Sequence, residues 1–228
     1  MPVWEMLNHA QHASLRVSRA SDGGRQFAQI VADEFLKAAP HYPILFTKHP
    51  ETGAFYAGVV MGLEQGDNLF AKDGVLADYR PADLERQGFY IADGQLVLDR
   101  EHDVFAAPDG HPIFEVDGAA ALPLKRVQNA LHVLQAGIPE TNALIGRLLA
   151  HRLLEPIDVT MSFDDGETLT LEGLYTISLD ALHALSDAAA LELFRTGDLQ
   201  LAYAQTGSVR HLRTLGRIRN DRLLDVAQ

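Results

Sequence analysis

Short turn signals that separate pairs of β-prone runs are the feature that most constrains how this chain can fold. Asp93-Gly94 lies between FYIA and QLVLDR, and this dipeptide is a strong short-range signal for a β-hairpin. Similar turn signals between apolar runs occur at residues 51–53, 108–110 and 164–166. Several hairpins this close together predict a largely antiparallel sheet. The run at 54–63 is apolar on both of its faces, so one strand of its hairpin is expected to be central.

Two helices are expected to interrupt these hairpins. Pro81 is predicted to begin a short helix that ends at Gly88. A longer helix is predicted over residues 25–39, ending before Pro40 and covering one face of the sheet. Its apolar face is expected to consist of Phe27, Ile30, Val31, Phe35 and Leu36.

Residues 122–154 have helical spacing, which Gly137 and Pro139 interrupt, so this segment is predicted to form either a helical hairpin or a strongly kinked helix. After the hairpin around 164–166, Ser178 and Ser186 are predicted to cap two helices. Asp198 is expected to cap the last helix, which runs through Leu201, Val209 and Leu212.

These elements together predict an α+β fold, with an antiparallel sheet built from several hairpins and packed against a helical hairpin and C-terminal helices. No linker divides the chain, so one domain is expected over residues 1–228. Its three regions are 1–121, mainly hairpins with two helices; 122–154, helical; and 155–228, a hairpin followed by helices.

The net charge of −12 argues against a protein that binds nucleic acid through its phosphate backbone. One basic segment is an exception, with arginines at 210, 213, 217, 219 and 222. These arginines are expected to pair with carboxylates of the same chain, and docking to an acidic partner is the alternative.

The absence of cysteine excludes disulfides, thiolate metal sites and a cysteine nucleophile. The N-terminal stretch lacks the basic start and apolar core of a signal peptide. The longest apolar run, at 54–63, is shorter than the roughly 20 residues that a membrane helix needs. We therefore expect a soluble cytoplasmic protein without a membrane span.

Common catalytic and cofactor motifs are absent from the chain. It contains no G-x-S-x-G elbow, no phosphate-binding loop, no G-x-G-x-x-G fingerprint and no H-E-x-x-H pair. His49 and Glu51, with His102 or His111 downstream, formally fit a two-histidine, one-carboxylate iron set, and His9 and His12 have H-x-x-H spacing. These patterns are short and common by chance, so no metal and no cofactor is predicted.

The segments LEGLYTISLDALHALSD and LAYAQTGSVRHL, at 171–187 and 201–212, contain the strongest candidate site residues. We expect Glu172 and Tyr175 to be largely buried and to meet the 201–212 segment in a common cluster. Ser208 and His211 share a face if that segment is helical. The weak ligand-binding candidates are Glu172, Tyr175, Tyr203, Gln205, His211 and Asn68.

Several of these candidates also have a structural interpretation. Tyr175 and Tyr203 are expected to bury their rings and hydrogen-bond through the hydroxyl. Asn68, in GLEQGDNLF, is expected to hydrogen-bond its own turn, and Gly62 and Gly66 to permit unusual backbone angles. Glu172, Gln205 and His211 have no evident structural task in the sequence.

The chain resembles the SapC family of bacterial proteins. The similar segments are YPILFTK, GLEQGDNLF, LEPIDVTM, LEGLYTISLDALHALSD and LAYAQTGSVRHLRTLGRI, in that order. The resemblance implies an accessory role beside a modifying enzyme. We therefore expect a protein that acts by binding a protein partner, either a modifying enzyme or a component of a transport system, or by binding a peptide or a small ligand. The alternatives are an enzyme of unrecognised type, for example a metal-dependent oxygenase-like protein, and a structural subunit that self-associates.

Overall fold

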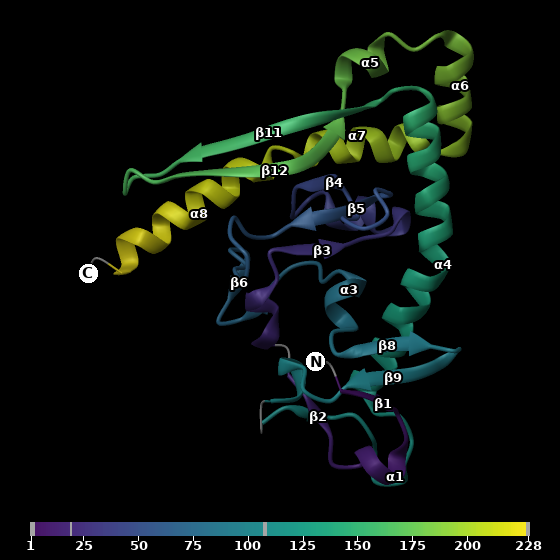
Figure 1. Cartoon of the computed structure of the whole chain (residues 1–228), viewed down its shortest axis with the longest axis vertical. Helices are drawn as coiled ribbons and strands as arrows, with labels where there is room; N and C mark the ends of the chain where they lie inside the picture. The colour runs from purple at the N-terminus through teal and green to yellow at the C-terminus, as the bar shows by residue number, and fades with distance from the viewer. Residues whose placement is uncertain (1–2, 19, 107–108, 227–228) are drawn as a thin grey trace.

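The protein has the predicted α+β fold (Figure 1). The computed structural model describes residues 3–18, 20–106 and 109–226. Its elements are, in order, β1 (Trp4–Met6), α1 (His9–His12), β2 (Arg16–Val17), η1 (Ala20–Gly24), β3 (Phe27–Gln29), η2 (Ala32–Glu34), α2 (Phe35–Ala38), β4 (Ile44–Lys48), β5 (Phe55–Val60), β6 (Ala71–Lys72), β7 (Val75–Leu76), α3 (Ala82–Glu85), β8 (Phe89–Ala92), β9 (Gln95–Asp99), η3 (Asp103–Phe105), β10 (His111–Pro112), α4 (Leu122–Ala150), β11 (Leu154–Ser162), β12 (Thr168–Ile177), α5 (Leu179–His183), α6 (Asp187–Thr196), α7 (Asp198–Ser208) and α8 (His211–Val226).

A five-stranded antiparallel sheet with the order β11-β12-β4-β5-β3 forms the centre of the molecule. The predicted hairpins β4–β5, β8–β9 and β11–β12 are confirmed, and β4 is the central strand. Asp93 and Gly94 have φ values of 49° and 72°, so both residues of the β8–β9 turn are left-handed. A two-residue turn of this kind matches the right-handed twist of the strands that it joins.

The predicted hairpin around residues 108–110 is wrong for the part of it that the structure describes. Residues 107 and 108 lie outside the described residues. β10 pairs with β2 instead, and the segment before the turn is the 3-10 helix η3. Val104 donates its backbone N–H to His102 and accepts one from Ser18. The N–H of Val104 is therefore bonded to a neighbouring side chain, and its carbonyl is bonded to the N-terminal segment.

The predicted helix over residues 25–39 is also wrong in its first half. Phe27–Gln29 forms the edge strand β3 against β5, and helical structure begins only at η2 and α2. Ile30 and Val31 are buried as expected, but Leu36 is 47% exposed. The free edge of β5 offers this apolar segment a partner, and the tertiary pairing outweighs a weak helical preference.

The segment 122–150 forms one continuous 29-residue helix, α4, with Pro139 inside it, so the helical hairpin is wrong. Gly137 allows this helix to pass very close to η2, because a Cβ at this position would lie 2.6 Å from the Cβ of Val31. Thr141 Oγ1 accepts the N–H of Ala32 at 2.8 Å and donates to the Gly137 carbonyl at 2.7 Å. In Figure 1, α4 runs from the small β8–β9 hairpin to the end of the central sheet.

Two separate helices, α7 and α8, replace the predicted single last helix. Ser178 and Ser186 cap α5 and α6, since their hydroxyls accept the N–H groups of Ala181 and Ala189 at 3.4 Å. Asp198 does not cap its helix, because Arg147 of α4 holds its carboxylate through bonds of 2.5 and 2.9 Å.

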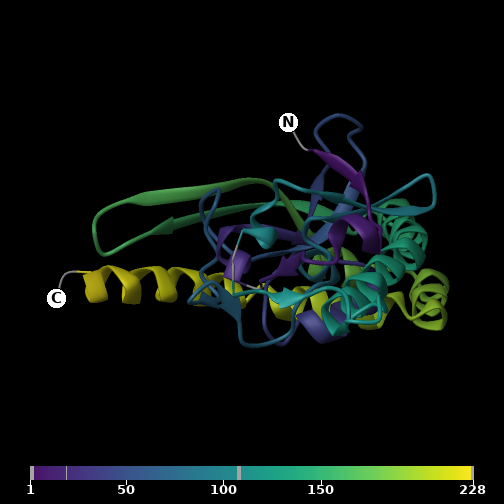
Figure 2. The ribbon, with the colours of Figure 1, turned by 90° about the horizontal axis from the view of Figure 1, so that it is seen from below.

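The β11–β12 hairpin extends beyond the central sheet, because β12 pairs with β4 only at Leu174 and Tyr175. We call residues 158–172 of this hairpin the arm. Figure 2 shows α8 alongside the arm, with the C-terminal end near its tip. Buried leucines and valines of the arm and α8 form a separate apolar cluster with Leu45 and Val60 of the sheet.

The two glycines of α4 provide a test of the close contact with η2. Gly137→Ala is expected to lower the free energy of unfolding by about 1–2 kcal/mol, because the added methyl group clashes with buried Val31. Gly146→Ala is expected to raise it by about 0.5–1 kcal/mol, because Gly146 has open space around it and alanine favours the helix. Urea unfolding measures both. Equal effects of the two substitutions would contradict the close contact.

Candidate functional site

Gln205 is completely buried and joins two strands of the central sheet. Its Nε2 donates to the carbonyl of Ile44 at 2.8 Å, and its Oε1 accepts the N–H of Ile177 at 3.1 Å. Beyond Tyr175 the strands β12 and β4 no longer pair, and the Gln205 amide lies between their backbones. It therefore takes the place of a backbone peptide group in the ladder, and we call it the Gln205 bridge.

Ser208 completes this arrangement one turn later on α7. Its hydroxyl accepts the N–H of Ile44 at 2.9 Å and donates to the Gln205 carbonyl at 2.6 Å. Both polar side chains thus satisfy buried backbone groups, which would otherwise destabilise the fold. Gln205 therefore has a structural role, which the sequence did not indicate.

Glu172 lies in a β-bulge, and its predicted burial is wrong. The register shifts there, so that Glu172 and Gly173 face Asp158 alone, and Gly173 has a φ of 72°. Bulges of this kind often use glycine in the left-handed region. The carboxylate is left exposed to solvent.

The two tyrosines lie in different environments. Tyr175 is half-buried, with its ring 4.8 Å from that of Phe55 and 5.0 Å from Lys48 Nζ. Tyr203 is 50% exposed, so its predicted burial is wrong.

His211 and Asn68 hold backbone segments in place. The His211 ring lies 3.1 Å from the carbonyl of Ala39, which links the start of α8 to α2. Asn68 is buried and accepts the N–H groups of Phe70 and Ala71 while donating to the Asp22 carbonyl. The predicted turn role of Asn68 is confirmed. The six candidate residues thus contact different parts of the molecule and do not form one cluster.

Three buried carboxylates around α3 were not predicted from the sequence. Asp22 accepts one hydrogen bond from Arg80 Nε, shared between its two oxygens, and a second from Nη2. Asp83 lies between Arg25 and Arg86, and Glu34 accepts the N–H groups of Val31 and Ala82 and the hydroxyl of Tyr79. Charged residues with no motif give no sequence signal of burial, because most of the partners that bury them lie far away in the chain.

The histidines of the two metal patterns make other contacts. His49 accepts the N–H of Glu51, and His102 accepts that of Val104. His12 lies 2.9 Å from Glu5, and His9 packs on Phe114. Within the described ranges, no three His, Asp or Glu side chains form a group that could hold a metal ion.

The largest groove among the principal cavities, about 910 Å³, lies between β11 and the α7–α8 segment. β11 is an edge strand, and residues 157–163 form one wall of this groove. Val209 and Leu212 contribute apolar surface, and Arg210 and Arg213 contribute charge. An apolar groove with a basic border is typical of a site that binds another molecule.

The C-terminal arginines fall into two groups. Arg219 pairs with Asp165 and Glu167, and Arg222 pairs with Asp67, so the predicted pairing within the chain is confirmed for these two. The side chains of Arg210, Arg213 and Arg217 have no hydrogen-bond or ion-pair partner in the part of the chain that the structure describes. Two of these three arginines border the β11 groove.

The chain belongs to the SapC family, whose family model matches residues 7–215. The chain has no significant match among curated proteins or solved structures. Across the described residues, no helix combines the length and the apolar character that crossing a membrane requires.

The Gln205 bridge predicts a large loss of stability on substitution. Gln205→Leu is expected to lower the free energy of unfolding by about 2–4 kcal/mol, because it leaves the carbonyl of Ile44 and the N–H of Ile177 without partners. Gln200→Leu, at an exposed position of the same helix, is expected to change it by less than about 0.5 kcal/mol. Chemical denaturation compares the two, and equal losses would refute the bridge.

His211 predicts a pH dependence of stability. Burial lowers the pKa of His211, although the hydrogen bond to the Ala39 carbonyl raises it. The unfolded chain therefore binds a proton more readily, so this contribution to stability is complete above the ordinary histidine pKa of about 6.5 and is lost as the pH falls. The difference in unfolding free energy between wild type and His211→Gln should shrink from about pH 7.5 to about 5.5. Parallel profiles of the two proteins would contradict this.

Proposed function

We propose that this SapC-family protein is a binding protein that holds an extended, acidic segment of a partner protein along β11. The free edge of β11 beside a groove with a basic border is the observation that carries the proposal. A strand added to an exposed sheet edge gains affinity from main-chain hydrogen bonds and specificity from the pockets beside it.

The alternation of the antiparallel ladder indicates which groups of β11 are available. Phe163 donates its N–H to Glu167, and Leu153 accepts that of Ser178, so odd-numbered residues of β11 face β12. Residues alternate in direction along a strand, so Asp158, Thr160 and Ser162 direct their N–H and carbonyl groups outward. Pro156 also lies at an outward position, where its missing N–H leaves the ladder with β12 intact. The stretch available for pairing is therefore 158–162.

The charges around the groove favour an acidic occupant. Arg210 and Arg213 border the groove without a carboxylate partner among the described residues, whereas the chain as a whole has a net charge of −12. Asp158 is the acidic side chain on the same wall, so a ligand carboxylate is expected nearer to α8 than to β11. Complementary charge of this kind increases association rates and selects among partners.

An accessory role beside a modifying enzyme fits a protein of this kind, because the groove can hold a segment of another chain without catalytic groups of its own. The proposal includes a cytoplasmic location, which a chain without cysteine accommodates. It includes no nucleic-acid ligand, since the charge of the chain is strongly acidic. Pairing of β11 with a second copy of this chain is an outcome that the test below distinguishes.

Proline substitutions on the two edges of the arm test the proposal. A fluorescein-labelled peptide of about eight alternating Glu and Val residues is titrated in fluorescence anisotropy. Thr160→Pro removes an outward N–H of β11 and is expected to weaken binding at least about tenfold. Thr170→Pro removes the corresponding group on β12, on the opposite edge of the arm, and is expected to leave binding unchanged.

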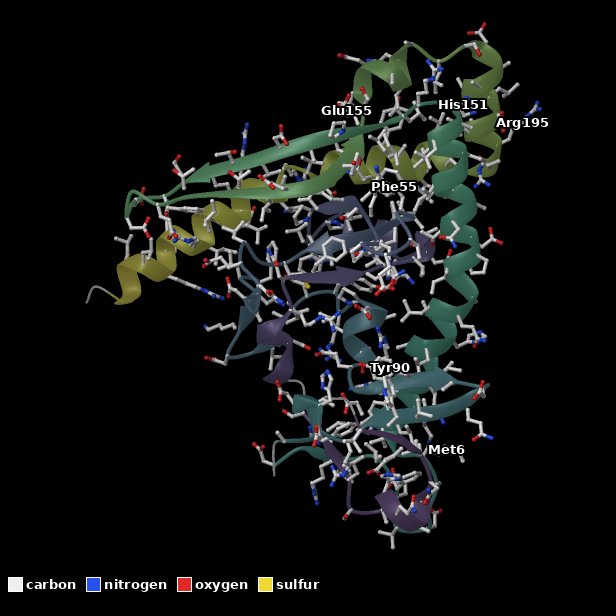
Figure 3. All side chains as sticks on the ribbon, viewed as in Figure 1. Met6, Phe55, Tyr90, His151, Glu155 and Arg195 are labelled. Atoms are coloured by element: carbon white, nitrogen blue, oxygen red, sulfur yellow. The ribbon has the colours of Figure 1, made fainter. Side chains whose placement is uncertain are left out.

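Charge is tested separately with the same peptide. Arg213→Gln is expected to weaken binding by about threefold to tenfold at low salt, whereas Arg195→Gln on α6, far from the arm in Figure 3, should have no effect. A Lys-Val peptide that binds equally well, or equal affinities of Thr160→Pro and Thr170→Pro, would refute the proposal. Sedimentation of the free protein as a dimer that Thr160→Pro dissociates would identify a second copy as the occupant instead.

A further inference from the structure

A second cleft lies on another part of the molecule and is independent of the β11 groove. It has a volume of about 500 Å³ and lies between strands β3 and β5, α3 and α4. In Figure 3, Phe55 marks the central sheet and Tyr90 the β8–β9 hairpin, and α3 lies between them in this view. A cleft of this size falls within the range of sites for small molecules.

Two arginines in this cleft share a single carboxylate. Arg25 Nη2 lies 2.6 Å from Asp83 Oδ2, and Arg86 Nη2 lies 2.5 Å from Asp83 Oδ1. The Asp83 side chain is only 5% exposed, whereas those of Arg25 and Arg86 are 34% and 23% exposed. One positive charge is therefore in excess at the border of the cleft.

The remaining donors of these guanidinium groups are available to a ligand. Each arginine donates one side-chain hydrogen bond, to Asp83, within the described ranges, and a guanidinium has five N–H groups. The charge of the two arginines also reaches His102: burial lowers the pKa of His102, Asp103 and Asp99 raise it, and Arg25 and Arg86 lower it. The two arginines thus offer positive charge together with N–H groups in a planar fork.

Aromatic rings form the adjoining wall. The rings of Phe27 and Tyr56 meet edge to face, with 5.8 Å between their centroids, and both side chains are half-buried. Both line the cleft together with Phe55. The Tyr56 hydroxyl has no hydrogen-bond partner among the described residues, so it can donate to a bound ligand.

We infer that this cleft binds a small aromatic carboxylate. The carboxylate lies against Arg25 and Arg86, because a planar guanidinium matches a carboxylate through two parallel hydrogen bonds. The aromatic ring of the ligand packs on Phe27 and Tyr56, where ring contacts add to the burial of apolar surface. Asp83 holds the two arginines in position through its ion pairs with both of them.

Isothermal titration calorimetry of the whole chain with 2-naphthoate tests this inference. Saturable binding at one site is expected, and the uncharged 2-naphthamide should bind at least about tenfold more weakly. Arg25→Gln is expected to weaken 2-naphthoate binding by about tenfold, and Tyr56→Leu by about threefold to tenfold.

Arg147→Gln is the matched control, because Arg147 is 32% exposed and pairs with a buried aspartate, as Arg25 does. The Arg147→Gln variant loses a similar ion pair, and its affinity for 2-naphthoate should stay the same. If Arg25→Gln fails to fold, Arg86→Gln and Arg25→Lys replace it, and Arg25→Lys should keep partial affinity because it retains the charge without the fork. The absence of saturable heat, equal affinity for the amide, or equal effects of the Arg25 and Arg147 substitutions would overturn the inference.

Discussion

The hydrogen bonds of Gln205 with the backbones of β4 and β12 are the interaction on which the rest of the architecture depends. β12 pairs with β4 at only two positions, and the Gln205 amide and the Ser208 hydroxyl satisfy the backbone groups where the strands separate. The separation lets α7 approach the sheet, and α8 follows from α7 along the arm. The segment of α7 and α8 that follows the Gln205 bridge then forms one wall of the groove beside β11.

Charged groups divide into those that hold the fold together and those that remain for a ligand. Asp22, Asp83 and Glu34 are buried and fully engaged, because an unpaired buried carboxylate would destabilise the protein by several kcal/mol. In two places, at the Asp83 cleft and at the start of α8, there are more arginines than carboxylates that pair with them. In an acidic chain, these two local excesses of positive charge are where anionic partners are expected.

Three of the four predicted hairpins and the two serine caps were predictable because their signals are local. Asp93-Gly94, Ser178 and Ser186 each act on backbone groups within a few residues, and all three predictions are confirmed. The predicted helix over 25–39 failed because Phe27–Gln29 pairs with β5, which lies about 30 residues further along the chain. The candidate cluster around Glu172 and Gln205 failed for the same reason. The tasks of these residues, in a bulge and between two separated strands, depend on pairings that no local pattern encodes.

The sequence by itself determined the α+β class, three of the four predicted hairpin turns, the two serine caps and the family. Hydrophobic period, turn residues and the family segments can all be read locally. The tertiary structure decided which strand remained at the edge, which arginines kept a carboxylate partner and which polar side chains were used up in the core. These properties depend on contacts between residues more than 100 positions apart, such as Gln205 with Ile44 and Thr141 with Ala32. Such contacts form only when the whole chain has closed around its core, because their entropic cost is offset only by the burial that the complete fold provides.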